Sequence, residues 1–205
     1  MDSKCKICRR AGEKLFLKGD RCFTPKCAVA RKPYPPGVHT RPSRRGLSEF
    51  GMQLREKQKL RNLYQIREAQ FSNYVHKAMA SKGADAADAL LQSLALRLDN
   101  MVFQAGFAQS RSVARQVVSH GHARVNGRKT TIPSYALRVG DTVTLSDRIW
   151  KSAVMKNIEP VLQKYVPPAW IILDGDRKTA TISAHPETKD QVSFNTKLII
   201  EYYAR

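Results

Sequence analysis

Four cysteines stand within the first 27 residues, and their spacing restricts how this part of the chain can fold. Cys5 and Cys8 are separated by two residues, Cys22 and Cys27 by four, and thirteen residues lie between the pairs. Two short-spaced pairs can grip one tetrahedral ion from opposite sides, and Zn²⁺ takes four thiolates at about 2.3 Å. The pattern therefore predicts one closed, structural zinc site, with Cys5, Cys8, Cys22 and Cys27 as its ligands and no open position for catalysis.

Two disulfides, idle thiols and an iron–sulfur cluster are the alternatives to zinc. No apolar stretch follows Met1, so we expect no secretory signal and a reducing compartment, which disfavours disulfides. This segment also has few large apolar residues, namely Ile7, Leu15, Phe16, Leu17 and Phe23. Metal binding would supply the folding free energy that so small a core lacks, on the order of 10 kcal/mol.

The charge of the chain is strongly unbalanced. Its 205 residues carry 36 Lys and Arg against 17 Asp and Glu, a formal net charge of +19, while an apolar content of 42% excludes wholesale disorder. Such an excess indicates a polyanionic partner. Nucleic acid fits best, because the sequence has no transmembrane run, lipidation signal or long basic amphipathic helix, and no membrane partner is expected.

The positive charge is concentrated in the first two thirds of the chain. Residues 1–45 hold 13 basic and 3 acidic side chains, residues 46–146 hold 14 and 7, and residues 147–205 hold 9 and 7. Residues 32–46 include four prolines, which disfavour helix, so an extended loop is expected there. Its Arg41, Arg44 and Arg45 suit contact with a phosphate chain, although a solvated linker has the same composition.

Helices are predicted after this loop. Ser48 is a candidate N-cap, a helical apolar pattern runs over 50–79, and a second helix begins near Asp85. Cations occupy the remaining faces of the first helix, and they are candidate RNA contacts or a solvated surface. These cations are Arg55, Lys57, Lys59 and Arg61.

A second group of elements follows from residue 97. A short helix over 97–106 precedes Ser110, which is expected to cap a helix over 111–120. Arg111 and Arg115 lie one turn apart on that helix, and we expect both to face outward. Asp99 and the neighbouring Arg97 suit an internal ion pair or a helix cap.

A small antiparallel sheet is predicted to pack on these two helices. Asn126-Gly127 is a strong signal for a type I′ turn between strands at 123–125 and 129–132, and a third strand is expected at 142–145. Further on, residues 167–173 suit a loop that enters a strand, and Trp150 and Trp170 are expected to pack within the last third.

No catalytic signature is present in the sequence. It lacks a Gly-x-Ser-x-Gly elbow, a His-Glu-x-x-His pair, a phosphate-binding Gly-x4-Gly-Lys loop and a Gly-x-Gly-x-x-Gly turn. His120 and His122 are therefore not accompanied by the other residues of a known catalytic motif, and no enzymatic activity is expected.

Several segments resemble a known family. Arg97-Leu98-Asp99-Asn100, residues 110–122, Val125-Asn126-Gly127 and Ile132-Pro133-Ser134-Tyr135 resemble the RNA-binding module named after the fourth protein of the small ribosomal subunit. Similar modules occur in tyrosyl-tRNA synthetases and pseudouridine synthases. Residues 54–61 and 198–205 resemble the ribosomal protein family itself, so the likeness runs from end to end. The cysteine pattern is similar to the zinc-bearing bacterial form of that family.

The resemblance implies an α+β fold with four parts. Residues 1–45 would form a zinc knuckle and a basic Pro-rich loop, and residues 46–96 a helical subdomain. Residues 97–146 would form an inserted helix–hairpin RNA-binding module. Residues 147–205 would form a carboxy-terminal segment that packs back on the helical subdomain.

The resemblance also implies a function. Family members are structural constituents of the small ribosomal subunit in the cytoplasm, and they bind a junction in the five-prime domain of its RNA early in assembly. Ribosomal protein five is among their neighbours, and their basic amino-terminal region lies near the messenger entry path and influences decoding accuracy. We expect the same partners here: small-subunit rRNA, mRNA near the entry path and neighbouring ribosomal proteins.

Binding of a folded RNA junction calls for phosphate contacts more than for base readout, because A-form helices hide their base edges. Ser110 and Arg111 stand at a helix start, where free backbone N–H groups favour anions. The full set of predicted RNA-binding residues is Arg41, Arg44, Arg45, Arg55, Lys57, Lys59, Arg61, Ser110, Arg111, Arg115, Gln116, His120, His122, Arg124, Asn126, Arg128 and Lys129.

Two other kinds of protein could carry such a module. An RNA-modifying enzyme would need a catalytic domain, for which 205 residues leave no room. A free-standing RNA chaperone or a repressor of its own messenger would use the same basic surface, so this alternative stays open.

Overall fold

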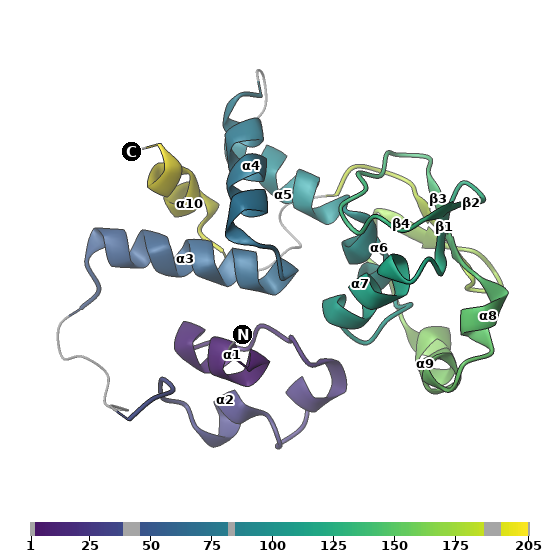
Figure 1. Ribbon diagram of the computed structural model, residues 1–205, viewed down its shortest axis with the longest axis horizontal. Coiled ribbons are helices and arrows are strands. Elements are labelled where there is room, and N and C mark those ends of the chain that lie inside the picture. Colours follow the sequence, from purple (N-terminus) through teal and green to yellow (C-terminus); the bar gives the residue numbers. More distant parts are fainter. Residues whose placement is uncertain (1–2, 39–45, 82–84, 187–193, 205) are drawn as a thin grey trace. The chain divides into compact units, whose positions relative to one another are not determined.

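The computed structural model describes residues 3–38, 46–81, 85–186 and 194–204 (Figure 1). The chain forms two compact units: Met1–Leu90 with Ser193–Arg205, and Leu91–Val192. Within the described residues, no helix is long and apolar enough to cross a membrane. The mixture of helices with an antiparallel sheet confirms the predicted α+β class.

The first unit begins with the cysteine-bearing segment. Its elements are α1 (Lys4–Ala11), the 3-10 helix η1 (Gly19–Cys22) and α2 (Ala28–Arg31). Helix α1 ends at Gly12, whose φ of 76° lies in the left-handed region that glycine adopts without strain. A Cβ at Gly12 would lie 2.7 Å from Nη2 of Arg55, so glycine also permits the close approach of that guanidinium.

The predicted helix over 50–79 is two helices in the structure, α3 (Glu49–Tyr64) and α4 (Glu68–Met79). The Ser48 side chain accepts a hydrogen bond from the Gly51 N–H at 3.2 Å, which confirms the predicted N-cap. Helix α3 ends because Gln65 adopts a left-handed φ of 54°, and this turn places Ile66 in the core. The apolar pattern continues across the break, which explains why the sequence suggested one helix.

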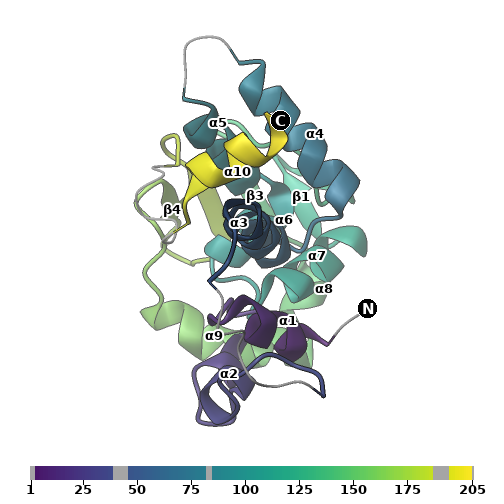
Figure 2. The same cartoon turned by 90° about the vertical axis from the view of Figure 1, so that its left-hand side faces the viewer.

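The carboxy-terminal helix α10 (Thr196–Tyr203) packs on α3 and α4 (Figures 1 and 2). Ile199 is fully buried there, and the Tyr203 ring lies 6.3 Å from that of Phe71. Helix α5 (Ala86–Ala95) begins close to the helix start predicted near Asp85. The boundary between the two units falls within this helix.

The second unit contains α6 (Leu98–Gln104), α7 (Arg111–Ser119), α8 (Asp147–Trp150) and α9 (Ala153–Lys164). Its sheet comprises β1 (Ala123–Val125), β2 (Arg128–Thr130), β3 (Thr142–Leu145), β4 (Ile171–Leu173) and β5 (Thr179–Ile182). The strand order is β2-β1-β3-β5-β4, and every neighbouring pair is antiparallel.

The turn between β1 and β2 has the predicted geometry. Val125 pairs with Arg128, and the two residues between them, Asn126 and Gly127, have φ of 48° and 79°. Positive φ at both positions defines a type I′ turn, whose twist matches that of the strands.

The predicted carboxy-terminal segment, residues 147–205, is divided in the structure. Strands β4 and β5 extend the predicted three-stranded sheet beyond β3, so residues 147–192 belong to the second unit, whereas α10 packs on α3 and α4. Trp170 is buried, whereas the Trp150 ring meets Phe107, which lies outside this segment, edge-on at 5.7 Å.

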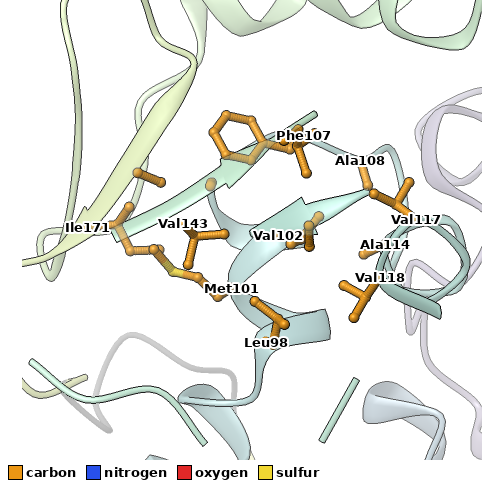
Figure 3. Close-up of a cluster of buried hydrophobic side chains, with 14 of the residues drawn as sticks. Leu98, Met101, Val102, Phe107, Ala108, Ala114, Val117, Val118, Val143 and Ile171 are labelled. Atoms are coloured by element: carbon orange, nitrogen blue, oxygen red, sulfur yellow. The ribbon is translucent and has the colours of Figure 1, made fainter. Parts of the chain in front are cut away.

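One apolar core holds the second unit together (Figure 3). Val102 of α6 lies on the side of Val118 of α7, whereas Met101 of α6 lies on the side of Val143 and Ile171 of the sheet. Each fully buried side chain of this size contributes about 1.5–3 kcal/mol through the apolar area that it removes from water. The core therefore fixes α7 and the β1–β2 hairpin against one rigid base.

Candidate nucleic-acid interface

The four cysteines gather around one small cavity of the first unit. Cys5 and Cys8 lie one turn apart on α1, Cys22 ends η1, and Cys27 is the residue before α2. All four line a cavity of about 20 Å³, roughly the room of one water-sized particle. None of the four is in a disulfide.

The surroundings of these thiols are positively charged. Lys4, Lys18 and Arg21 also line the cavity. Burial raises the pKa of the Cys8 thiol, and the other three thiols add to this, while a backbone hydrogen bond from Leu15 opposes it. Burial, and then the charge of Lys18, lower the pKa of the Lys4 ammonium. A cation among the thiols would favour their charged form.

A metal ion was the predicted occupant of this cavity. Among the described residues, no three or more Cys, His, Asp or Glu side chains form a group that is placed to hold a metal ion. Four thiols around one cavity are nevertheless the donor set that Zn²⁺ prefers, so the residues fit the ion by their chemistry. The zinc site stays a prediction.

A larger cleft of about 900 Å³ lies in the same unit, between α1 and the α3–α4 break. Its apolar wall includes Leu17, Leu54 and Ile66. Six cations line it: Lys4, Arg10, Arg55, Lys59, Arg61 and Arg67. These six cations make the cleft basic, which suits a phosphate chain.

Two of the predicted RNA-binding lysines on α3 are buried and have carboxylate partners. Lys59 Nζ lies 2.7 Å from both Glu13 and Glu56. Burial opposes its charge, but hydrogen bonds to both carboxylates raise the pKa of Lys59 above its ordinary value. Lys57 Nζ lies 2.5 Å from Glu68 and 4.5 Å from the centre of the Tyr202 ring. RNA binding by these two lysines stays a prediction, and the structure gives each an internal role.

The two arginines of α3 are more open than the lysines. Arg55 is exposed and donates from Nη2 to the Ala11 carbonyl at 2.6 Å, which ties α3 to the end of α1. Arg61 donates to Glu68 Oε2 at 3.1 Å. Although burial opposes it, hydrogen bonds from Lys57 and Tyr203 and the charge of Arg61 lower the pKa of Glu68.

In the second unit, the predicted outward orientation of Arg111 and Arg115 was wrong, while RNA binding by these two residues stays a prediction. Arg115 does not face outward, because its Nη2 lies 2.7 Å from Asp99 Oδ2. Arg111 donates from Nε to Asn100 Oδ1 at 2.9 Å, and its guanidinium lies over the Phe103 ring at 4.6 Å. Both side chains turn toward α6 because its polar groups accept hydrogen bonds from them. Helical spacing alone could not predict this orientation.

Asp99 is buried between two arginines. The Arg97 guanidinium, which is also buried, donates to both Asp99 oxygens at 3.0 and 2.8 Å, which confirms the predicted internal ion pair. The sequence analysis missed Asn100, whose side chain donates to the Ala95 carbonyl at 2.9 Å while it accepts from Arg111. Ser110 is buried and accepts from the Val113 N–H at 3.5 Å, which confirms the cap.

Five predicted RNA-binding residues of the helix–hairpin module have exposed side chains, and we call them together the hairpin surface. Arg124 occupies the exposed position of β1, between buried Ala123 and Val125. The members of the hairpin surface, all of them exposed, are Gln116, His120, Arg124, Arg128 and Lys129. No described carboxylate forms an ion pair with these cations.

Two neighbours of this surface serve the fold. The Asn126 side chain donates to Asp141 at 2.8 Å and accepts from the Thr142 N–H at 2.9 Å, so it fixes the turn to β3. His122 Nδ1 lies 3.2 Å from Ser146 Oγ. Arg41, Arg44 and Arg45 lie outside the described residues.

Comparisons with known proteins cover the whole chain. A family model described as "Ribosomal protein S4/S9 N-terminal domain" matches residues 1–95, and one described as "S4 domain" matches residues 96–143. Proteins named "Small ribosomal subunit protein uS4" are similar over nearly their full length. The one from Syntrophomonas wolfei is 46% identical over 100% of this chain and 98% of its own, and the one from Desulfitobacterium hafniense is 48% identical over 98% and 96%.

Proposed function

The chain belongs to the bacterial uS4 family of small ribosomal subunit proteins, and we propose that the hairpin surface is its main contact with RNA. As a member of that family it is a structural constituent of the cytoplasmic ribosome that binds rRNA, without enzymatic activity. The observation that carries this function is the identity of 46% over 100% of this chain and 98% of the relative's chain.

The hairpin surface suits phosphate binding because its cations are exposed on a rigid base. Arg124, Arg128 and Lys129 project from a two-stranded hairpin, and the type I′ turn at Asn126 holds the tip narrow. Each cation that meets a phosphate releases condensed counterions, which gives affinity without sequence readout. The wide minor groove of A-form RNA accepts such a tip and offers 2′-hydroxyls to Gln116 and His120.

The cleft beside α1 is the second RNA contact that we propose. Arg55 and Arg61 lie at its rim, and the carboxylates that pair with Lys57 and Lys59 hold α3 in place beneath it. Arginine suits this role because its planar fork can hold one phosphate with two donors.

We propose that Cys5, Cys8, Cys22 and Cys27 hold one structural Zn²⁺. The support is the shared cavity, the four-thiol donor set and the cations around it, which offset the charge of a four-thiolate centre. Zinc, when bound, supplies folding free energy to a segment whose buried apolar side chains are few.

Finer features of the function follow from the family resemblance and remain proposals. They are binding to a five-prime domain junction, early nucleation of assembly, contact with ribosomal protein five, and an influence on decoding accuracy. Arg41, Arg44 and Arg45 are proposed to face the messenger near its entry path.

Reconstitution tests the function directly. We expect the free protein to bind naked small-subunit rRNA and to sediment with the assembled subunit after washing in moderate salt. Protein that stays at the top of the gradient, yet binds its own messenger, would instead indicate a free-standing regulator. The variant Arg124→Ala combined with Arg128→Ala should bind rRNA more weakly, and Lys151→Ala combined with Lys178→Ala is the matched control on exposed lysines of the same unit.

A further inference from the structure

Two phenylalanine rings are stacked on the surface of the cysteine-bearing segment. Phe16 and Phe23 have ring centroids 5.0 Å apart and ring planes inclined by 29°. Phe16 is 41% exposed and Phe23 is 75% exposed, although phenylalanine normally gains from burial. Neither ring belongs to the hairpin surface or to the basic cleft, so the exposed pair has no role in the contacts described above.

The backbone holds Phe16 in an unusual conformation. Its φ of 48° lies in the left-handed region, which bulky residues rarely adopt. Leu15 and Leu17, on either side, are both buried, so their anchoring turns the Phe16 ring outward. Strain of this kind persists where the surroundings impose it, and it is found at binding sites.

Phe23 is equally well fixed by its neighbours. It follows Cys22 directly, and its N–H donates to the Asp20 carbonyl at 3.0 Å. The next residue, Thr24, donates from its hydroxyl to the Arg21 carbonyl at 3.0 Å. Phe23 is therefore held in place by its neighbour Cys22 and by a short, hydrogen-bonded turn.

The surroundings of the pair are cationic. Lys14 and Lys18 flank Phe16 by two residues on each side, and Arg21 and Lys26 flank Phe23. All four side chains are exposed. An apolar protein partner would have to remove these charges from water, and charged residues are depleted at the centres of protein interfaces. A flat aromatic group attached to a phosphate chain can stack on the two rings, while its phosphates pair with the cations.

We infer that Phe16 and Phe23 form a stacking platform for an unpaired base of the small-subunit RNA, with the flanking cations on its phosphates. This inference rests on the proposed function, and it adds a base contact on the first unit to the phosphate contacts. Unstacked RNA bases commonly lie on aromatic side chains, and the stack accepts any base because every base has a flat face.

The test compares variants that keep or remove the aromatic face. Phe23→Leu keeps an apolar side chain but loses the flat ring, and it should lower the affinity of the full-length protein for naked small-subunit rRNA about 5- to 100-fold. Phe23→Trp should bind at least as tightly as the wild type. The slope of log affinity against log salt should stay unchanged in both variants, because no cation is removed.

Phe50→Leu is the matched control, because Phe50 is 49% exposed and its ring lies 5.6 Å from that of Tyr202 on α10. It should bind as the wild type does. Circular dichroism and thermal unfolding of each variant should match the wild type, so that lost affinity is not lost fold.

Three outcomes would overturn the platform. They are wild-type affinity in Phe23→Leu, an equal loss in Phe50→Leu, and crosslinking of a photoreactive residue at position 23 to a ribosomal protein instead of to RNA. The last result would make the pair a protein contact. Failure of the wild-type protein itself to bind rRNA would refute the proposed function instead, so the two failures are distinguishable.

Discussion

Arg115 on α7 places its Nη2 atom 2.7 Å from Oδ2 of Asp99 on α6. The same carboxylate accepts from the buried Arg97, so one negative charge holds two arginines and joins the two helices beneath the hairpin surface. A buried charge that loses its partner is strongly destabilising, whereas the partly exposed Arg115 can turn to water.

We therefore expect Asp99→Asn to lower the free energy of unfolding by about 3–5 kcal/mol, because it leaves the Arg97 charge buried and uncompensated. Urea denaturation of the free protein at neutral pH measures the change. Asp176→Asn, at an exposed turn position, should change it by less than about 0.5 kcal/mol. Equal stability of the two variants would contradict the assigned role of Asp99.

The ion-pair network around Glu68 predicts a pH dependence. Lys57, Tyr203 and Arg61 lower the pKa of Glu68 against the effect of burial, so its folded pKa lies below its unfolded value near 4.5. Its contribution to stability is then present above the unfolded pKa and is lost as pH falls through the folded pKa.

Glu68→Gln should consequently be less stable than the wild type at neutral pH, and the difference should shrink as the solution is acidified below the ordinary carboxyl range. Denaturant unfolding of both proteins at a series of pH values measures this difference in the free energy of unfolding. The general effect of net charge acts on both proteins, so it cancels in the difference. Glu159→Gln, on the exposed face of α9, is the matched control and should change the free energy of unfolding at neutral pH by less than about 0.5 kcal/mol.

Local signals predicted much of the fold. The Ser48 and Ser110 caps, the Asn126-Gly127 turn and the strand at 142–145 depend on residues close in sequence, and the structure contains all of them. The resemblance of the whole chain to its family rests on such segments as well, and the comparisons confirm it.

Features that depend on distant partners could not be predicted in this way. The pairing of β3 with β5 draws residues 147–192 into the second unit, and no local pattern announces that pairing. Glu13, 46 residues before Lys59 in the chain, makes that lysine a buried ion-pair partner, and Asp99 pairs with the partly exposed Arg115. A lysine or arginine in a helical pattern therefore shows only where positive charge occurs in the sequence. The tertiary fold decides which group that side chain contacts.

Loss of one cation from the hairpin surface should change the salt dependence of RNA binding. Arg128→Ala is expected to weaken binding and to reduce the slope of log affinity against log salt by about 0.7–0.9, the contribution of one phosphate contact. Titrations at several salt concentrations measure the slope, and the free energy of unfolding should change by less than about 0.5 kcal/mol. An unchanged slope would remove Arg128 from the phosphate-binding set.

Metal analysis of protein purified under reducing conditions should find one Zn²⁺ per chain. Cys5→Ser should lose the ion and with it the packing of α1, because the segment has little core of its own. Loss of helical circular dichroism after chelator treatment of the wild type provides the second measurement. Zinc-free protein with an intact amino-terminal fold would refute the site.

The last prediction concerns Arg41, Arg44 and Arg45, in the Pro-rich sequence between the cysteine-bearing segment and α3. Cations can hold a passing single strand by its phosphates without reading its sequence. Ribosomes with alanine at all three positions should therefore form normal small subunits, yet translate through stable messenger hairpins more slowly than the wild type. Sedimentation of the subunits and a single-turnover translation assay measure the two effects. A defect in subunit assembly would mean that these arginines contact structural RNA, and the messenger proposal would be wrong.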